Sequence, residues 1–415
     1  MVIKAILSSM LLWAAPGKAY YCSTSGDDAG KGDRSHPFRT LQRVAALSLT
    51  PGDTVFLRGG EVFTGVLQLP AGSAGQAQRP IVITSYGQGR AVIDGGNGAA
   101  LALYKAAHLK LSNLELRGAG RKDGNKESGL VLNTCRHITA DDLFVNGFQK
   151  SGIYIYRSSH IQITRVKAYD NGYAGISVEG PYGTRDCDHI LIKDCRAENN
   201  PGDPTNLSNH SGNGIVVGYC RKVVIDGCVA TNNGWDMPRI GNGPVGIWAY
   251  EADSVTIRYC ISFRNRTARG ADDGGGFDLD GGVTHSVIAH CLSYENEGSG
   301  FGLFQYAGAS PWHDNSVHDC VSNNDGLVSA AHAGVFIWNS SRDPGQLRSC
   351  HFYNNTIYNT RGAVIHYAKD GEHSGFRFYN NAFIATDSLI RGVRGPDDVF
   401  SGNHWTGILP DSTFR

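Results

Sequence analysis

A short strand-like pattern returns many times along the chain, each time after a glycine. The first and third residues after the glycine are apolar, as in Ile153 and Ile155 after Gly152. Alternation with a period of two is typical of β-strands that bury one face. The shortest interval, from Gly152 to Gly175, fits one coil of a right-handed parallel β-helix. The glycines that open these strands are Gly129, Gly152, Gly175, Gly214, Gly246, Gly276, Gly300, Gly334 and Gly362.

A second repeated feature is a column of cysteines at nearly constant intervals. Its members are Cys195, Cys228, Cys260, Cys291, Cys320 and Cys350. This regular spacing indicates one inward-facing position of a repeat rather than a disulfide framework, because a buried Cys packs as a small hydrophobe. We therefore expect mostly free thiols. The chain has no Cys-x-x-Cys or His-x-x-x-His pair, so local spacing gives no support for a structural zinc site.

Asn, replaced once by Asp, forms a third column five residues after the cysteines. Its members are Asn200, Asn233, Asn265, Asn296, Asp325 and Asn355, with Asn146 and Asn171 extending it upstream. An Asn at a repeated corner can hold a left-handed turn, and stacked copies can bond one another. Stacked rungs share one apolar interior. The sequence therefore predicts an all-β, single-domain, right-handed parallel β-helix with an N-terminal cap.

The N-terminus has the features of a secretory signal peptide. One early lysine precedes an apolar run from Ala5 to Ala15 and a small residue before Tyr20. The run is too short to span a membrane. We expect a signal peptide over 1–19, a cap over 20–60 consisting of strand, short amphipathic helix, turn and strand, and the β-helix over 61–415. The mature protein is expected to be secreted or periplasmic, without a membrane span.

Composition supports this fold and excludes several classes of protein. Of 415 residues, 54 are glycine and only 18% are charged, which disfavours a helical protein. Lys plus Arg and Asp plus Glu both number 38. Without a basic surplus, no nucleic-acid partner is expected.

The even positions of the glycine-led strands should point outward, and many are aromatic. The outward pairs are Tyr154/Tyr156, Ser177/Glu179, Val216/Gly218, Trp248/Tyr250, Asp278/Asp280, Gly302/Phe304, Phe336/Trp338 and Val364/His366. Exposed aromatic stripes usually mark a binding site, and flat rings suit the apolar faces of sugars. The alternative is that loops cover this face and make the aromatics a secondary core.

Several coils are longer than the one from Gly152 to Gly175, and the excess must form loops beside this face. Segments 201–213, 234–245 and 266–275 should form one wall of a groove, and segment 305–315 the other. Such a groove suits a polysaccharide or oligosaccharide. The expected substrate-binding residues are Tyr156, Glu179, Trp248, Tyr250, Phe304, Gln305, Trp338 and His313.

The densest chemical pattern is segment 271–282, which holds four aspartates among glycines. Asp278 and Asp280 lie two apart on one strand and project from the same face, with Cα atoms about 6.6 Å apart. Crowded carboxyls titrate unequally and can supply the acid and base of glycoside hydrolysis. We expect this pair to be catalytic, with Asp273 and Glu251 as further acids.

The same segment permits two other interpretations. It is either a plain Gly-Asp-rich turn or a calcium site in which Asp272 and Asp273 join the strand aspartates. A calcium site would suit a polysaccharide lyase or uronate epimerase, with Arg269 or Arg266 as the base. The hydrolase interpretation needs no cofactor.

Segments 20–28, 37–42 and 51–55 resemble the N-terminal segment of secreted right-handed β-helix proteins in the pectate-lyase-like superfamily. Segments 277–282 and 294–298 are similar to those of secreted β-helix proteins grouped with carbohydrate-active enzymes. The resemblance implies the fold, on which lyases, hydrolases, epimerases and adhesins all occur. Of the four motifs of polygalacturonase-like hydrolases, only Asp-Asp has a counterpart, at Asp272-Asp273.

Three functions stay open at this stage. The first is a polysaccharide-degrading glycoside hydrolase that uses Asp278 and Asp280 in an aromatic-lined groove. The second is the calcium-dependent lyase or epimerase. The third is a non-catalytic glycan-binding β-helix. The neutral net charge favours a neutral glycan.

Overall fold

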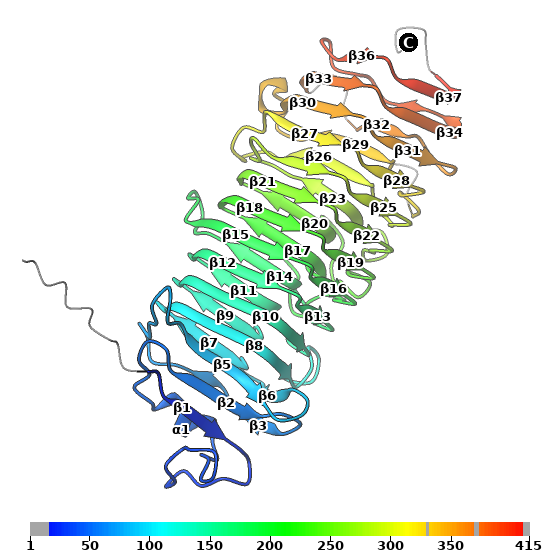
Figure 1. Ribbon diagram of the computed structural model, residues 1–415. Coiled ribbons are helices and arrows are strands. Elements are labelled where there is room, and N and C mark those ends of the chain that lie inside the picture. The colour runs from blue at the N-terminus through cyan, green and yellow to red at the C-terminus, as the bar shows by residue number, and fades with distance from the viewer. Residues whose placement is uncertain (1–15, 329–331, 369–372, 410–415) are drawn as a thin grey trace, which may run out of the picture.

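The structure is a computed structural model that describes residues 16–328, 332–368 and 373–409. These residues wind into an elongated solenoid, with the blue N-terminal strands at one end and the red C-terminal strands at the other (Figure 1). Strands of successive coils pair in parallel throughout the two sheets. The predicted parallel β-helix is confirmed.

One sheet contains 12 strands and carries the glycine-led pattern. In chain order its strands are β4 (Leu67–Gln68), β7 (Leu101–Tyr104), β9 (Leu130–Asn133), β11 (Ser151–Tyr156), β14 (Ala174–Glu179), β17 (Asn213–Gly218), β20 (Val245–Tyr250), β23 (Gly275–Leu279), β26 (Phe301–Gln305), β29 (Val335–Asn339), β32 (Ile365–Tyr367) and β35 (Ile390–Arg391).

The other sheet contains 25 strands in two columns, joined through the long strands β8 (Ala107–Gly118) and β10 (Arg136–Asn146). The first column adds β1 (Ala19–Cys22), β2 (Thr54–Arg58), β5 (Ile81–Tyr86), β12 (Ser159–Thr164), β15 (Cys187–Lys193), β18 (Cys220–Asp226), β21 (Asp253–Arg258), β24 (Val287–Ala289), β27 (Asn315–His318), β30 (Arg348–Tyr353), β33 (Ser374–Tyr379) and β36 (Val399–Ser401). The second adds β3 (Val62–Thr64), β6 (Ala91–Gly96), β13 (Lys167–Tyr169), β16 (Arg196–Glu198), β19 (Val229–Thr231), β22 (Ile261–Phe263), β25 (Leu292–Tyr294), β28 (Val321–Asn323), β31 (Thr356–Asn359), β34 (Ala382–Ser388) and β37 (His404–Ile408).

The N-terminal segment has the predicted order of strand, helix, turn and strand. Helix α1 (Leu41–Ala45) lies between β1 and β2, and the Thr40 side chain caps it by accepting from the Arg43 N–H. Leu41 and Val44 are buried against the first coils. A short 3₁₀ turn, η1 (Pro344–Gln346), follows β29.

Residues 1–15 of the expected signal peptide lie outside the described residues, and β1 already begins at Ala19. Over the part of the chain that the structure describes, the helices are too short to cross a membrane.

The cysteine column is buried and all ten thiols are free, as predicted. Five members of the column stack on one another in successive coils, namely Cys195, Cys228, Cys260, Cys291 and Cys320. Cys350 does not belong to this stack, because the longer coil before it places it beside Asn315 instead. Asn355 takes its position and accepts from the Cys320 N–H.

The amide column forms a buried hydrogen-bonded ladder, in which each Oδ1 accepts from the backbone N–H and, at most rungs, the Nδ2 of the preceding coil. Its members are Asn171, Asn200, Asn233, Asn265, Asn296 and Asp325, and a second ladder joins Asn355, Asn381 and Asn403.

Three details of this prediction were wrong. Asn355 is in register with Cys320 rather than with the ladder residue Asp325, because Thr356 pairs with Val321. Asn146 lies outside the ladder and bonds Tyr169 and Glu115, because a two-residue offset puts Phe148 opposite Asn171. The left-handed residue at each corner is the one before the ladder residue, such as Asn199 or Asn232.

The inward positions of the glycine-led strands are buried as predicted, but at the last rung the outward position is buried as well. There Val335 pairs with Ile365, so Val364 rather than Gly362 is the counterpart of Gly334. Val364 is therefore buried in the core instead of pointing outward. The shift affects only β32, at the C-terminal edge of the outward face.

Candidate active site

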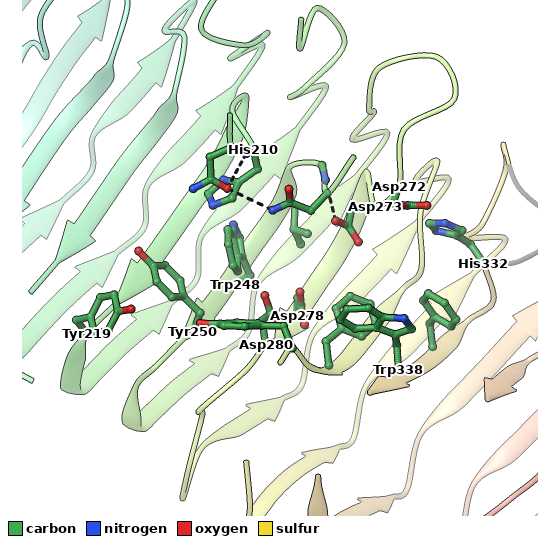
Figure 2. Close-up of a pocket in the computed structure, with 17 residues that line it drawn as sticks. His210, Tyr219, Trp248, Tyr250, Asp272, Asp273, Asp278, Asp280, His332 and Trp338 are labelled. Atoms are coloured by element: carbon green, nitrogen blue, oxygen red, sulfur yellow. Dashed lines mark hydrogen bonds between the residues drawn. The ribbon is translucent and has the colours of Figure 1, made fainter. Parts of the chain in front are cut away.

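A cavity of about 660 Å³ opens on the outward face of the 12-stranded sheet, over strands β17 to β29 (Figure 2). Its size is within the range of about 300–1,000 Å³ that is common for small-ligand sites. The cavity is lined by Asn209, His210, Tyr219, Asn242, Gly243, Val245, Trp248, Tyr250, Asp272, Asp273, Asp278, Asp280, Phe304, Tyr306, His332, Phe336 and Trp338.

The floor consists of two rows of side chains that the strand register aligns. One row runs Trp248, Asp278, Gly302, Phe336, and the other runs Tyr250, Asp280, Phe304, Trp338. Asp280 therefore lies between the aromatic residues Tyr250 and Phe304, and Asp278 lies between Trp248 and Gly302. The strand alternation in the sequence predicted these positions correctly.

Asp278 is the most buried carboxyl of the cavity. Its side chain is 3% exposed, and Oδ1 has no hydrogen-bond partner among the described residues. Burial, and then the charges of Asp280 and Asp273, raise the pKa of Asp278 well above its usual range. Because water is excluded, the neutral carboxylic acid is the favoured form at neutral pH.

Asp280 and Asp273 are both partly exposed to the cavity. Burial, with a contribution from Glu251, raises the pKa of Asp280 to about 6, although its Oδ1 accepts the Gly281 N–H at 2.7 Å. Burial also raises the pKa of Asp273 to about 7, against the effect of a 2.8 Å bond from the Gly243 N–H. Asp273 belongs to loop 266–275, so the carboxyls come from both floor and wall.

The wall contributes two neutral histidines. His210 packs edge-on against Trp248 with ring centroids 4.8 Å apart, and burial lowers its pKa to about 4. Its Nδ1 lies 3.0 Å from the amide of Asn213, which in turn accepts the indole N–H of Trp248. His332 stacks on Phe336, and burial lowers its pKa too.

Segments 201–213, 234–245 and 266–275 supply one side of the cavity, as predicted, through residues such as His210, Asn242 and Asp273. The opposite segment 305–315 contributes Tyr306 alone. Tyr219 and His332 lie outside the four loops named from the sequence, and no periodic pattern marks them.

Five residues expected at the site belong to the supporting structure instead. Glu251 accepts the Ser310 N–H, Gln305 is buried and bonds Gly282 and Ser310, and Glu179 bonds the Tyr173 hydroxyl. Tyr156 stacks on Tyr154 of its own strand, β11, and His313 bonds Asp314 on another face. None of the five lines the cavity. Strand parity gave the outward direction of Tyr156 and Glu179 but not the length of the cavity along the axis.

Arg269 and Arg266 are exposed on their loop and do not line the cavity. The lining residues include neither Lys nor Arg. Asp272 is exposed at the rim, and in the described chain the aspartates of segment 271–282 form no group of three with ligand atoms within 4.8 Å of one another.

Comparison with known proteins agrees with this architecture. The profile of the family described as Pel9A-like, right handed beta helix region matches residues 20–363. A lacto-N-biosidase from Bifidobacterium longum subsp. longum is 24% identical over 513 aligned positions, which cover 96% of this chain and 31% of the relative. The chain thus spans about a third of the length of that curated relative.

Two solved structures share the fold. The GH136 lacto-N-biosidase from Eubacterium ramulus superposes with a TM-score of 0.63 at 19% identity, covering 94% of this chain and 68% of that one. The catalytic domain of a GH87 α-1,3-glucanase, in complex with tetrasaccharides, gives 0.61 at 13% identity, covering 94% and 69%.

Proposed function

This chain belongs to the family of Pel9A-like right-handed β-helix proteins, and from that premise we propose that it is a glycoside hydrolase whose active site is the cavity over β17 to β29. The observation that carries the proposal is the group of three aspartates in an aromatic-lined cavity, two with pKa values of about 6 and about 7. Acid–base catalysis is most efficient when the pKa lies near the working pH. The names of the lacto-N-biosidase and glucanase relatives support the same reaction class.

We assign Asp273 as the general acid and Asp280 as the base or nucleophile. Both are partly exposed, so both can touch a bound sugar, whereas Asp278 is buried beneath them. At a pH between the two values, Asp273 keeps its proton and Asp280 is ionised. Asp278 stays protonated beneath them, because burial and the neighbouring carboxyls raise its pKa well above its usual range. The proposed catalytic pair is therefore Asp273 and Asp280, in which Asp273 replaces the Asp278 expected from the strand register.

The substrate we propose is a neutral oligosaccharide that enters the cavity end-on. Tyr250, Phe336 and Trp338 are partly exposed and offer ring faces for sugar stacking. Trp248 is only 5% exposed and packs in a small apolar cluster, so it supports the floor from beneath. The absence of Lys and Arg from the lining gives a sugar carboxylate no cationic partner. The same feature disfavours the lyase and epimerase, because Arg269 and Arg266 do not line the cavity. We also propose that residues 1–19 act as a signal peptide that directs export, because glycans of this kind occur outside the cell.

The test is digestion of a panel of neutral and uronate-containing oligosaccharides, with and without EDTA. We expect new reducing ends without the ultraviolet absorbance of unsaturated uronates, and no effect of EDTA. Asp273→Asn and Asp280→Asn should abolish turnover but keep glycan binding. Glu198→Gln is the matched acid control, because Glu198 lies on the other sheet and pairs with Lys167 and Arg196. Absorbance that EDTA removes would establish the calcium-dependent lyase. Binding without turnover, unchanged in Asp280→Asn, would establish the non-catalytic glycan binder.

A further inference from the structure

Clusters of histidine and aspartate side chains occur on a different face of the solenoid from the cavity. Within the described ranges, three of them have ligand atoms within 4.8 Å of one another: His160/Asp188/His189, His285/His313/Asp314 and His290/His318/Asp319. None of these residues lines the cavity. Imidazole nitrogen and carboxylate oxygen are the usual protein ligands of zinc, beside thiolate.

The second cluster has the geometry of a metal site. Asp314 Oδ2 lies 2.8 Å from His313 Nδ1 and 3.8 Å from His285 Nε2. Two ligands at about 2.0–2.2 Å from one zinc ion stand roughly 3–4 Å apart, which the His285–Asp314 distance fits directly. The shorter contact between His313 Nδ1 and Asp314 Oδ2 is a hydrogen bond, and its proton is released when the ion binds. The three side chains are 57%, 23% and 51% exposed for His285, His313 and Asp314, so an ion can reach them and water can complete the coordination.

A second carboxylate orients His285. Its Nδ1 lies 2.8 Å from Asp253 Oδ1, and Asp253 is fixed by the hydroxyls of Thr284 and Ser254. An ionised carboxylate only accepts, so Nδ1 carries the proton and Nε2 presents its lone pair towards Asp314. A carboxylate behind a ligating histidine is the usual arrangement in zinc sites and raises the basicity of the ligand.

The third cluster has the same arrangement as the second cluster, shifted by five residues along the chain. A comparison of the two shows which feature is particular to the second cluster. His290, His318 and Asp319 have the same spacing as His285, His313 and Asp314. At the position of Asp253, however, stands Arg258, which bonds Asp226 and whose neighbour Tyr259 stacks on His290. A guanidinium repels a metal ion and orients no imidazole.

The first cluster is weakened in a related way, because the guanidinium of Arg221 lies 3.4 Å from Asp188. In the second cluster Arg185 is held on the Gly282 carbonyl and lies 3.8 Å from Asp253, so it touches the orienting carboxylate rather than the ligands. The pKa of Asp314 is lowered chiefly by the hydrogen bond from His313 and also by the charge of Arg348. Arg348 donates its Nε–H to the Gly345 carbonyl and forms no ion pair with Asp314 among the described residues.

We propose that His285, His313 and Asp314 bind a divalent transition-metal ion, with zinc as the preferred ion, and that Asp253 positions His285 for it. The ion joins the turn that follows Asp280 to the loop that carries Tyr306, which come from successive coils. Because His285 and His313 are a full coil apart along the chain, no local spacing in the sequence indicates them. This site is independent of the proposed hydrolase activity.

The test is calorimetric titration of ZnCl₂ into EDTA-stripped, dialysed full-length protein and four variants. We expect the wild type to bind one zinc ion more tightly than any other. His285→Ala and His313→Ala should weaken that site at least tenfold, and Asp253→Asn about tenfold, the lower end of second-sphere effects. His290→Ala, at the matched position of the third cluster, should leave it unchanged. Circular dichroism of each metal-free variant checks that the fold is kept.

Cobalt gives a second readout, since Co²⁺ in a site of nitrogen and oxygen ligands absorbs visible light. We expect the band in the wild type and in His290→Ala, and its loss in His285→Ala. Identical zinc titrations of wild type and His285→Ala would overturn the proposal. Equal loss in His290→Ala would overturn it as well, because it would show unspecific binding to surface histidines.

Discussion

Asp278 and Gly302 occupy the same register position on the neighbouring strands β23 and β26. A Cβ atom at position 302 would lie 3.0 Å from Asp278 Oδ1 and 2.7 Å from the Phe304 ring. The lack of a side chain there lets the ring and the carboxyl lie side by side. The floor of the cavity therefore depends on a glycine that touches no substrate.

Gly302→Ala should reduce kcat/KM about a hundredfold, because a displacement of Phe304 or Asp278 by an ångström disturbs the placement of the substrate. The variant should still fold, since Gly302 lies on the outward face rather than in the core. Steady-state kinetics on the best oligosaccharide measures the effect. Gly98→Ala, where the nearest heavy atom to a new Cβ is 3.5 Å away, is the control. Wild-type kinetics in Gly302→Ala would contradict this account of the floor.

The activity should follow a bell-shaped pH profile. Below about 6 the base Asp280 becomes protonated, and above about 7 the acid Asp273 loses its proton, so kcat/KM falls on both sides of a maximum between these values. The measurement is kcat/KM from pH 4 to 9 on a substrate without ionisable groups, as a check that the limbs belong to the enzyme. A rate that still rises above pH 8 would remove Asp273 from the role of acid.

Asp278→Asn should stabilise the protein at neutral pH. The pKa of Asp278 is raised in the folded state, so the folded chain holds this proton more tightly than the unfolded chain. Between the unfolded and the folded pKa its contribution to stability therefore falls as pH rises. We expect Tm to rise by about 2 °C or more at pH 7, and the gain to vanish near pH 4. An equal gain at both pH values would show that charge burial is not its cause.

Asn265→Ala should destabilise the solenoid strongly. The Asn265 Oδ1 accepts both the backbone N–H and the Nδ2 of the buried Asn233. Two buried donors left without acceptors cost about 1–3 kcal/mol each. The midpoint of urea unfolding should therefore drop clearly in this variant. In Asn146→Ala, which lies outside the ladder, it should change little. Similar midpoints in the two variants would show that the ladder adds nothing to stability.

The repeat made most of the fold predictable from sequence. Gly276, Phe277 and Leu279 illustrate why: alternation fixes which side chains enter the core, and the same rule placed Asp278 and Asp280 on the outward face. The rule holds only while coils keep one register. It failed at Cys350 and at Val364, where coils of unequal length shift the pairing by a few residues.

The loops limited the prediction of the site. His210 and His332 reach the cavity from irregular segments, whose conformation depends on contacts with neighbouring coils rather than on any periodic signal. Conversely, Glu179 lies on the outward side but is engaged by Tyr173, and Gln305 is fully buried and accepts the Gly282 N–H. The candidate metal ligands His285 and His313 were also missed. They lie a full coil apart in the sequence and come together only because successive coils of the solenoid stack on one another.

The cavity draws on consecutive coils of a solenoid in which each coil contacts mainly its neighbours. The number of coils sets the length of the scaffold, whereas the loops beside the cavity set the ligand preference. The two can therefore change separately in this protein. Adding or removing a whole coil near β12 would change how far the cavity is held from the N-terminal cap, without altering the register of β20, β23 and β26. Lengthening one loop would reshape the cavity and leave the spacing untouched. The number of coils and the shape of the cavity can therefore be changed independently in an engineered version of this chain.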